Sequence, residues 1–153
     1  MRITDILSES LVIADLRGQT KEAVLRELAE RLAAVYPQVG AAHLVDVLWE
    51  REGLGSTAIG DGIAIPHGKL PGLKSVLAAF GRHLQGVDFQ SLDGKPSTLF
   101  FLLVAPEDSV GLHLKALARV SRLLKEPSFR QKLMAAADRS AVYETIRRED
   151  EKY

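Results

Sequence analysis

The residues best suited to chemistry lie in one glycine-rich segment, residues 51–72, which reads REGLGSTAIGDGIAIPHGKLPG. Six of the chain's twelve glycines lie within the last twenty residues of this segment, residues 53–72. Because glycine permits positive φ and close main-chain approach at an entropic cost, this density predicts a compact local arrangement. Residues 63–65 favour a short apolar strand that ends at His67. Pro66 stiffens the backbone before this histidine and Gly68 removes bulk after it, so the imidazole should be fixed and accessible.

The imidazole of His67 can act as a nucleophile near pH 7, because its unperturbed pKa is about 6.5. A histidine in an ordinary turn is the competing interpretation. A metal site is disfavoured, since the four histidines show neither HxxxH nor HExxH spacing and the chain contains no cysteine. His43 and His83 lack chemical neighbours and are expected to be surface or structural residues. The fourth histidine is His113.

Common enzyme motifs do not fit this segment. A hydrolase triad built from Ser56, Asp61 and His67 would lack the GxSxG elbow. The GxG of residues 60–62 precedes a strand-like run rather than a helix, which argues against a dinucleotide site, and no GxxxxGK[ST] loop occurs. Ser56 and Thr57 are expected to cap the turn, and Lys69 to be a solvated charge that helps orient a partner.

The composition is that of an ordinary globular domain. The 153 residues include 20 basic and 20 acidic side chains, so no cationic field favours nucleic acid or an anionic membrane. Hydrophobic residues make up 46% of the chain, which argues against disorder. The longest apolar run, residues 99–105, is far short of the ~20 residues that cross a bilayer, and the N-terminus lacks a signal-peptide pattern. No membrane insertion and a cytoplasmic location are expected.

Helical periodicity begins after Thr20, where apolar residues at positions 25, 28, 29, 32 and 36 predict a helix with Thr20 as its N-cap. The same spacing from residue 41 predicts a second helix that ends between residues 51 and 53. Asp108 or Ser109 is expected to cap a third helix, Pro127 to begin a fourth, and residues 142 and 146 to mark a fifth. The apolar stripe expected on the third helix comprises Leu114, Leu117, Ala118 and Leu124.

Two apolar runs favour strands. Residues 75–81, SVLAAFG, suit a short strand, and residues 97–105, STLFFLLVA, suit a strand buried on both faces and closed by Pro106. Alternation of helices with strands predicts an α/β domain with helices on both faces of a sheet. No repeat or linker divides the chain, so one domain is expected over residues 1–148, followed by a polar tail at 149–153.

The run from Glu52 through Ile59 and Gly60 to IAIPHG resembles the active-site signature of the fructose/mannitol type of enzyme IIA, from the bacterial phosphoenolpyruvate-dependent phosphotransferase system. The stretch GSTAIGDGIAIPHGKL is most similar to the nitrogen-regulatory branch. The resemblance continues through FQSLDGKPSTLFFLLVAPEDS and HLKALARVSRLL, and so covers nearly the whole chain. It implies a three-layer α/β sandwich, a mixed β-sheet flanked by helices on both faces. The site would lie at one edge, between the loop around His67 and the start of the helix that carries His113.

The resemblance also implies roles for three residues. His67 would accept a phosphoryl group on Nε2 from an HPr-type phosphocarrier, and Arg51 and His113 would bind the phosphate, with no metal or organic cofactor. From the residues alone, Arg51 is a solvated charge at a helix end. Helical spacing places His113 on an apolar stripe, as a core histidine, although the start of a helix also favours anions. The matching spacing, 16 residues before His67 and 46 after it, favours function for both.

Three hypotheses follow. The first is a regulatory, nitrogen-type enzyme IIA, a phosphotransferase with a phosphohistidine intermediate whose target proteins read the phosphorylation state of His67. The second is a sugar-specific fructose or mannitol enzyme IIA that passes its phosphate to a IIB domain. The third is a binding module that has lost the phosphorelay, which the presence of His67, Arg51 and His113 disfavours.

Overall fold

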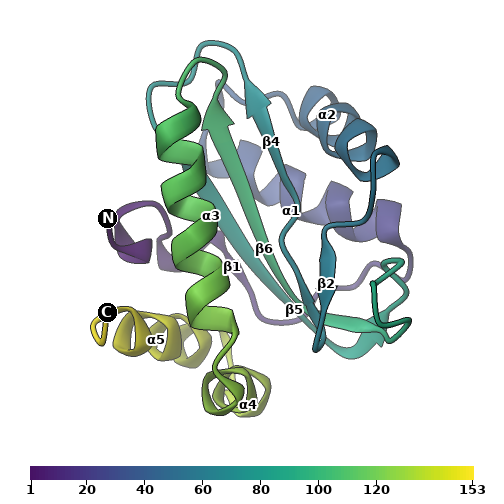
Figure 1. Cartoon of the computed structure of the whole chain (residues 1–153), viewed down its shortest axis with the longest axis vertical. Coiled ribbons are helices and arrows are strands. Elements are labelled where there is room, and N and C mark those ends of the chain that lie inside the picture. The colour runs from purple at the N-terminus through teal and green to yellow at the C-terminus, as the bar shows by residue number, and fades with distance from the viewer.

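A computed structural model describes all 153 residues as a mixed sheet covered by helices on both faces (Figure 1). Helices α1 (Lys21–Val35) and α2 (Ala41–Gly53) lie on one face and α3 (Val110–Leu124) on the other. Helices α4 (Pro127–Ala135) and α5 (Arg139–Asp150) follow α3, at the lower end of the view. Two short 3₁₀ helices, Ile3–Asp5 and Glu9–Leu11, precede the sheet. The expected three-layer α/β sandwich is confirmed.

The sheet has six strands in the order β1-β5-β6-β3-β2, with β4 also paired to β6. Strand β6 is central and runs antiparallel to β5 but parallel to β3 and β4, so the sheet is mixed as expected. The strands are β1 (Val12–Ile13), β2 (Ala58–Gly60), β3 (Ile63–Ala64), β4 (His67–Leu70), β5 (Leu77–Val87) and β6 (Ser97–Pro106).

His67 begins strand β4 rather than lying in a loop, which corrects the expected placement. Strands β3 and β4 run in succession along β6, with Ala64 opposite Phe100 and His67 opposite Leu103. Proline between them has no N–H to donate, although its carbonyl still accepts the Leu103 N–H at 3.0 Å. Pairing with β6 therefore fixes the backbone of His67 at the start of β4.

The predicted helix starts are largely confirmed. The Thr20 hydroxyl accepts the N–H of Ala23 at 3.1 Å and caps α1. Pro127 is the first residue of α4, where its missing N–H costs nothing. Ser109 occupies the N-cap position of α3, but its side chain makes no capping hydrogen bond. The first N–H groups of α3 are therefore without a side-chain cap.

Strand β5 extends to Val87, six residues beyond the predicted end at residue 81. Arg82, the first residue beyond that end, is almost completely buried. Its guanidinium donates to the carbonyls of Ala14 at 2.9 Å, Leu133 at 2.9 Å and Ala136 at 2.6 Å. Because these carbonyls satisfy the cation, the strand continues through it.

The apolar stripe predicted for α3 is partly wrong. Leu124 is buried and Leu117 half-buried, but Leu114 is 58% exposed and Ala118 is also exposed. The helix is rotated so that a different set of residues faces the sheet. The buried residues of α3 are His113, Ala116, Val120, Leu123 and Leu124.

The packed chain extends beyond residue 148, where the polar tail was expected to begin. Helix α5 continues to Asp150, which is 1% exposed. Its carboxylate lies 2.7 Å from Arg119 Nη2 and accepts the N–H of Thr4 at 3.2 Å. The acidic residue is therefore a buried link between α5, α3 and the N-terminal 3₁₀ helix, not part of a solvated tail.

Candidate active site

His67 is held in one defined tautomer. Its Nδ1 lies 2.8 Å from the carbonyl oxygen of Ile65. A carbonyl oxygen only accepts, so Nδ1 must carry the ring proton. Nε2 then carries the free lone pair, and no protein group hydrogen-bonds to it. The ring is half-buried, which leaves this nitrogen as a fixed nucleophile at the surface.

His113 lies directly beside this ring. The centroids of the His67 and His113 rings are 5.2 Å apart, and the planes are tilted by 52°. His113 stands in the first turn of α3 and is 8% exposed, and its Nδ1 is buried without a partner. A buried imidazole with an unused nitrogen has hydrogen-bonding capacity left for a ligand.

Arg51 approaches from α2, in the last turn of the helix. Its Nη1 donates to the carbonyl of Gly55 at 2.9 Å, in the loop that follows the helix. Gly55 has φ +146°, a conformation that L side chains rarely adopt, and this turns the loop back toward the arginine. One edge of the guanidinium is fixed by this bond, and its other donors remain free for an anion.

Gly68 allows α2 to pack closely on β4 beside His67. A Cβ at this position would lie 2.8 Å from Cγ1 of Val47, inside van der Waals contact. The glycine therefore serves helix packing rather than access to the imidazole. Close packing brings the C-terminal turn of α2, with Arg51, next to the start of β4.

The electrostatic environment keeps both imidazoles neutral. Burial lowers the pKa of His67 below 6.5, and the nearby Arg51 charge lowers it further, against opposing effects of the Ile65 carbonyl and Glu52. Burial also lowers the pKa of His113, with smaller contributions from His67 and Lys69. At pH 7 the His67 Nε2 lone pair is therefore available.

This environment predicts the pH dependence of His67. An NMR titration of the ring should give a pKa below 6.5, so that Nε2 is protonated, and nucleophilicity lost, only as the pH falls below that value. The Arg51→Ala variant should titrate at higher pH than the wild type, since a neighbouring cation is removed. A wild-type pKa at or above 6.5, or no upward shift in the variant, would contradict this electrostatic account.

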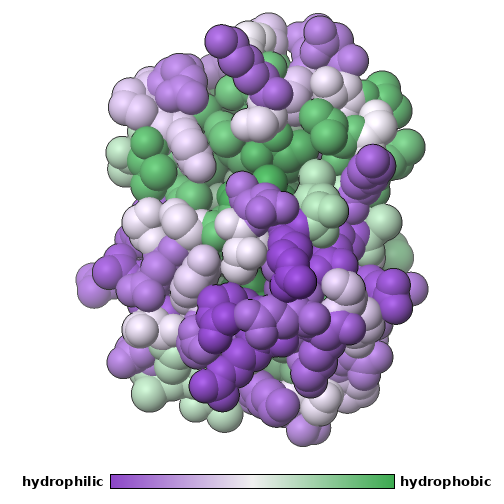
Figure 2. Space-filling model, turned by 90° about the vertical axis from the view of Figure 1, so that its left-hand side faces the viewer, coloured by the Kyte–Doolittle hydropathy of each residue, from purple (hydrophilic) through white to green (hydrophobic).

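The three residues line an open depression of about 520 Å³. Its rim carries exposed apolar side chains, with Leu54 84% and Val110 54% exposed, and the charges of Glu50 and Lys69. On the face shown in Figure 2, which is the left-hand side of Figure 1, apolar side chains also gather in the upper half, whereas the lower half is mainly polar. A nucleophile, a cation and an apolar rim thus occur at one place. The ten lining residues are Val47, Glu50, Arg51, Leu54, His67, Gly68, Lys69, Val110, His113 and Leu114.

The two hydroxyl residues near the site have structural roles, as expected. The Ser56 hydroxyl donates to the Phe89 carbonyl at 2.7 Å and accepts the Ala58 N–H at 3.1 Å. The Thr57 hydroxyl bonds the buried carboxylate of Glu52. Neither hydroxyl is free for a hydrolase triad, which agrees with the missing GxSxG motif.

The remaining histidines lie outside the site, as expected. His43 is exposed on α2. His83 is buried in β5, and its Nδ1 accepts the N–H of Gly86 at 3.0 Å. The structure contains no group of three or more His, Cys, Asp or Glu side chains placed to hold a metal ion. None of its helices is both long and apolar enough to cross a membrane.

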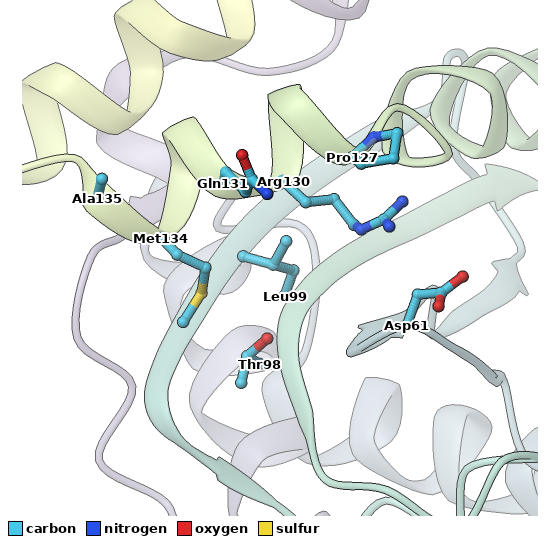
Figure 3. A pocket seen from close by; sticks show the side chains of 8 residues that line it. All are labelled: Asp61, Thr98, Leu99, Pro127, Arg130, Gln131, Met134 and Ala135. Carbon is cyan, nitrogen blue, oxygen red and sulfur yellow. The ribbon is translucent and has the colours of Figure 1, made fainter.

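A second depression, of about 440 Å³, lies between the start of β6 and α4 (Figure 3). In this view Arg130 extends from α4 toward the side of the depression where Asp61 lies, and Leu99 lies between α4 and Thr98. Arg130 Nη1 donates to the carbonyls of Leu124 and Lys125, each at 2.9 Å, and so caps the C-terminal end of α3. The depression has no imidazole or hydroxyl nucleophile apart from Thr98, and it does not compete with the site around His67.

Comparison with known proteins agrees with the resemblance over almost the whole chain. The family model for the phosphoenolpyruvate-dependent sugar phosphotransferase system, EIIA 2, matches residues 5–149. A nitrogen regulatory protein of Bradyrhizobium diazoefficiens is 43% identical over 146 residues, 95% of each chain. The fructose-specific EIIABC component of Bacillus subtilis is 35% identical over 150 residues, which are 98% of this chain and 24% of that protein.

The solved structures give the same result. The crystal structure of the nitrogen regulatory protein IIA-Ntr from Neisseria meningitidis superposes with a TM-score of 0.87 at 33% identity and covers 94% of this chain and 98% of that one. Family model, sequence relatives and fold agree. This chain therefore belongs to the EIIA type 2 family of the phosphoenolpyruvate-dependent sugar phosphotransferase system, and it is similar throughout to the nitrogen-regulatory members.

Proposed function

We propose that this protein accepts a phosphoryl group on Nε2 of His67 from an HPr-type phosphocarrier and regulates target proteins by its phosphorylation state. The supporting observation is the Nδ1–H bond from His67 to the Ile65 carbonyl, which aims an unprotonated Nε2 at the depression beside Arg51 and His113. Family membership supports phosphoryl transfer in general. The acceptor atom, the donor and the regulatory outcome are specific to the proposal.

The transfer step follows from the tautomer. The Nε2 lone pair of His67 attacks the phosphorus of the donor's phosphohistidine in line, the new N–P bond forms, and the donor's N–P bond breaks with its electron pair returning to the donor imidazole. The Nδ1 proton stays on His67, where the Ile65 carbonyl stabilises the positive ring of the phosphohistidine. No proton transfer from His67 is needed, so no general base is required.

Arg51 and His113 suit the charge that moves in this step. The transition state spreads negative charge over three equatorial oxygens, which fixed donors stabilise best. The free edge of the Arg51 guanidinium supplies a preoriented cation. His113, neutral because burial lowers its pKa, keeps one ring N–H that it can donate to a phosphoryl oxygen.

Two features support a regulatory role, the negative charge that phosphorylation adds and the exposed apolar surface around His67. Phosphorylation adds about −1.5 to −2 charges near pH 7, on a chain whose formal net charge is zero. The added charge lies within a rim that includes exposed Leu54, Val110 and Leu114, a surface suited to protein contacts. A target protein docked on this rim would gain or lose affinity when His67 is modified.

Phosphorylation from a purified relay tests the proposal. The protein is incubated with a phosphorylated HPr-type carrier, and intact mass is measured under alkaline conditions that preserve phosphohistidine. One phosphoryl group per chain is expected, and only when the carrier is present. Absence of any adduct would overturn the proposal and favour a binding module that has lost the phosphorelay.

A second candidate is a sugar-specific enzyme IIA that passes phosphate to a IIB domain. The observation in its favour is the 35% identity to the fructose-specific component of Bacillus subtilis, of which this chain matches one part. Phosphorylated protein is mixed with fructose- and mannitol-type IIB domains. Rapid loss of phosphate to a IIB domain would favour this candidate, whereas retention of phosphate with every IIB domain favours regulation.

A further inference from the structure

A buried ion pair joins α1 to α2, the helix that carries Arg51. Lys21 Nζ of α1 is 2.9 Å from Glu52 Oε1 of α2, and each residue is 7% exposed. Lys21 also donates to Gln90 Oε1 at 3.0 Å and lies 4.9 Å from the centre of the Phe89 ring. Because desolvation offsets much of the attraction in such pairs, and apolar replacements are often as stable, stability alone does not explain this pair.

The pair holds the loop that follows α2. The Glu52 carboxylate accepts the backbone N–H of Thr57 at 3.0 Å and also the Thr57 hydroxyl. The Glu52 carbonyl accepts the N–H of Gly55 at 3.0 Å. The Gly55 carbonyl in turn accepts the Arg51 guanidinium at 2.9 Å. The position of Arg51 therefore depends on a loop whose two ends Glu52 fastens together.

The same carboxylate is linked to His67. The Thr57 carbonyl accepts the N–H of Ile65 at 3.1 Å, and the Ile65 carbonyl accepts Nδ1–H of His67 at 2.8 Å. A continuous series of hydrogen bonds thus runs from Glu52 through Thr57 and Ile65 to the ring whose tautomer exposes Nε2. Orientation of a reacting imidazole by groups behind it is a recurring requirement of catalysis.

We infer that Lys21 and Glu52 are positioning residues for phosphoryl transfer, which hold Arg51 and the Nδ1–H tautomer of His67 through the loop of residues 52–57. The inference rests on the proposed function. The positive charge of Lys21 neutralises the buried Glu52 carboxylate. The oxygens of this carboxylate accept hydrogen bonds from the Lys21 ammonium and from Thr57. Neither residue touches the phosphoryl group.

The test removes both charges together, so that no unpaired ion remains buried. In Lys21→Met/Glu52→Leu the side-chain volumes are retained and the bonds to Thr57 are lost. We expect labelling by the phosphorylated HPr-type carrier to slow roughly ten- to hundredfold, the range for misplaced reacting groups. In ¹⁵N NMR spectra, the single Nδ1–H tautomer of His67 should be replaced by a mixture.

A second buried pair provides the matched control. Arg119→Met/Asp150→Leu removes an ion pair of 2.7 Å whose side chains are 16% and 1% exposed, remote from the loop of residues 52–57. This variant should keep the wild-type labelling rate and His67 tautomer. Equal losses of labelling rate in both variants would show that Lys21 and Glu52 serve only general stability, and would overturn the inference. A wild-type labelling rate and His67 tautomer in Lys21→Met/Glu52→Leu would overturn it as well.

Thr57→Val provides a milder variant if the paired replacement does not fold. It removes only the hydroxyl bond to Glu52 and should shift the His67 tautomer in the same direction with a smaller loss of rate. Wild-type behaviour of folded Thr57→Val, in both readouts, would then overturn the inference. A wild-type protein that is not labelled at all would instead overturn the proposed function, so the two failures are distinguishable.

Discussion

Replacing His67 with alanine is expected to abolish phosphorylation by the HPr-type carrier. The variant lacks the imidazole whose Nδ1–H is held by the Ile65 carbonyl, which leaves an unprotonated Nε2 free of protein hydrogen bonds at the depression. We expect that His113 does not replace it, because His113 is only 8% exposed whereas His67 is half-buried. Intact-mass measurement under alkaline conditions should detect no adduct at times when the wild type is fully modified.

His43→Ala is the matched control for this loss. His43 is an exposed histidine of α2, and its removal should leave labelling at the wild-type rate. Labelling of His67→Ala at the wild-type rate would show that another residue accepts the phosphoryl group. Loss of labelling in both variants would point to a damaged fold, which circular dichroism would detect.

Replacing Arg51 with alanine is expected to give the second largest effect. A good charged hydrogen bond contributes roughly 1.5 to 3 kcal/mol, so the transfer rate should fall roughly ten- to hundredfold. The phosphohistidine should also hydrolyse faster or return faster to the carrier, because its negative charge loses the fixed guanidinium. Rapid-quench labelling and the decay of isolated phosphoprotein measure the two effects.

Arg51→Lys separates charge from geometry. A lysine retains the cation but lacks the forked donors that bind Gly55 and an anion together, so it should restore only part of the rate. Full recovery by lysine would show that charge alone is needed. Wild-type kinetics in Arg51→Ala would remove Arg51 from the site.

Local sequence patterns predicted most of the fold. Periodicity located all five helices, Thr20 and Pro127 marked two helix starts, and the apolar run of residues 97–105 identified the central strand. Each of these signals acts between residues close in sequence. The order of the strands is set by contacts between distant segments, and only the family resemblance implied their arrangement.

The wrong ends predicted for β5 and for the packed chain share one physical cause, which is that long-range partners bury charged residues. Arg82 continues β5 because carbonyls 51 to 68 residues away accept its donors. Asp150 belongs to the packed helix because Arg119, 31 residues away, neutralises it. Lys21 is a similar case, since a lysine in the first turn of an amphipathic helix is expected to be solvated. No periodic pattern contains this information.

In the candidate site too, only some of the residues could be predicted from local sequence patterns. The flanking Pro66 and Gly68 singled out His67 from the residues alone. Arg51, however, had the pattern of a surface charge and His113 that of a core residue, and only the resemblance paired them with His67. The structure places the three around one depression, as that resemblance implied.

The central claim is that Nε2 of His67 is the acceptor atom. The most direct test is NMR of ¹⁵N-labelled protein after phosphorylation by the HPr-type carrier, with ³¹P–¹⁵N coupling used to identify the bonded nitrogen. The account predicts coupling to Nε2 of His67, with a proton retained on Nδ1. Coupling to Nδ1, or to any nitrogen outside His67, would contradict it.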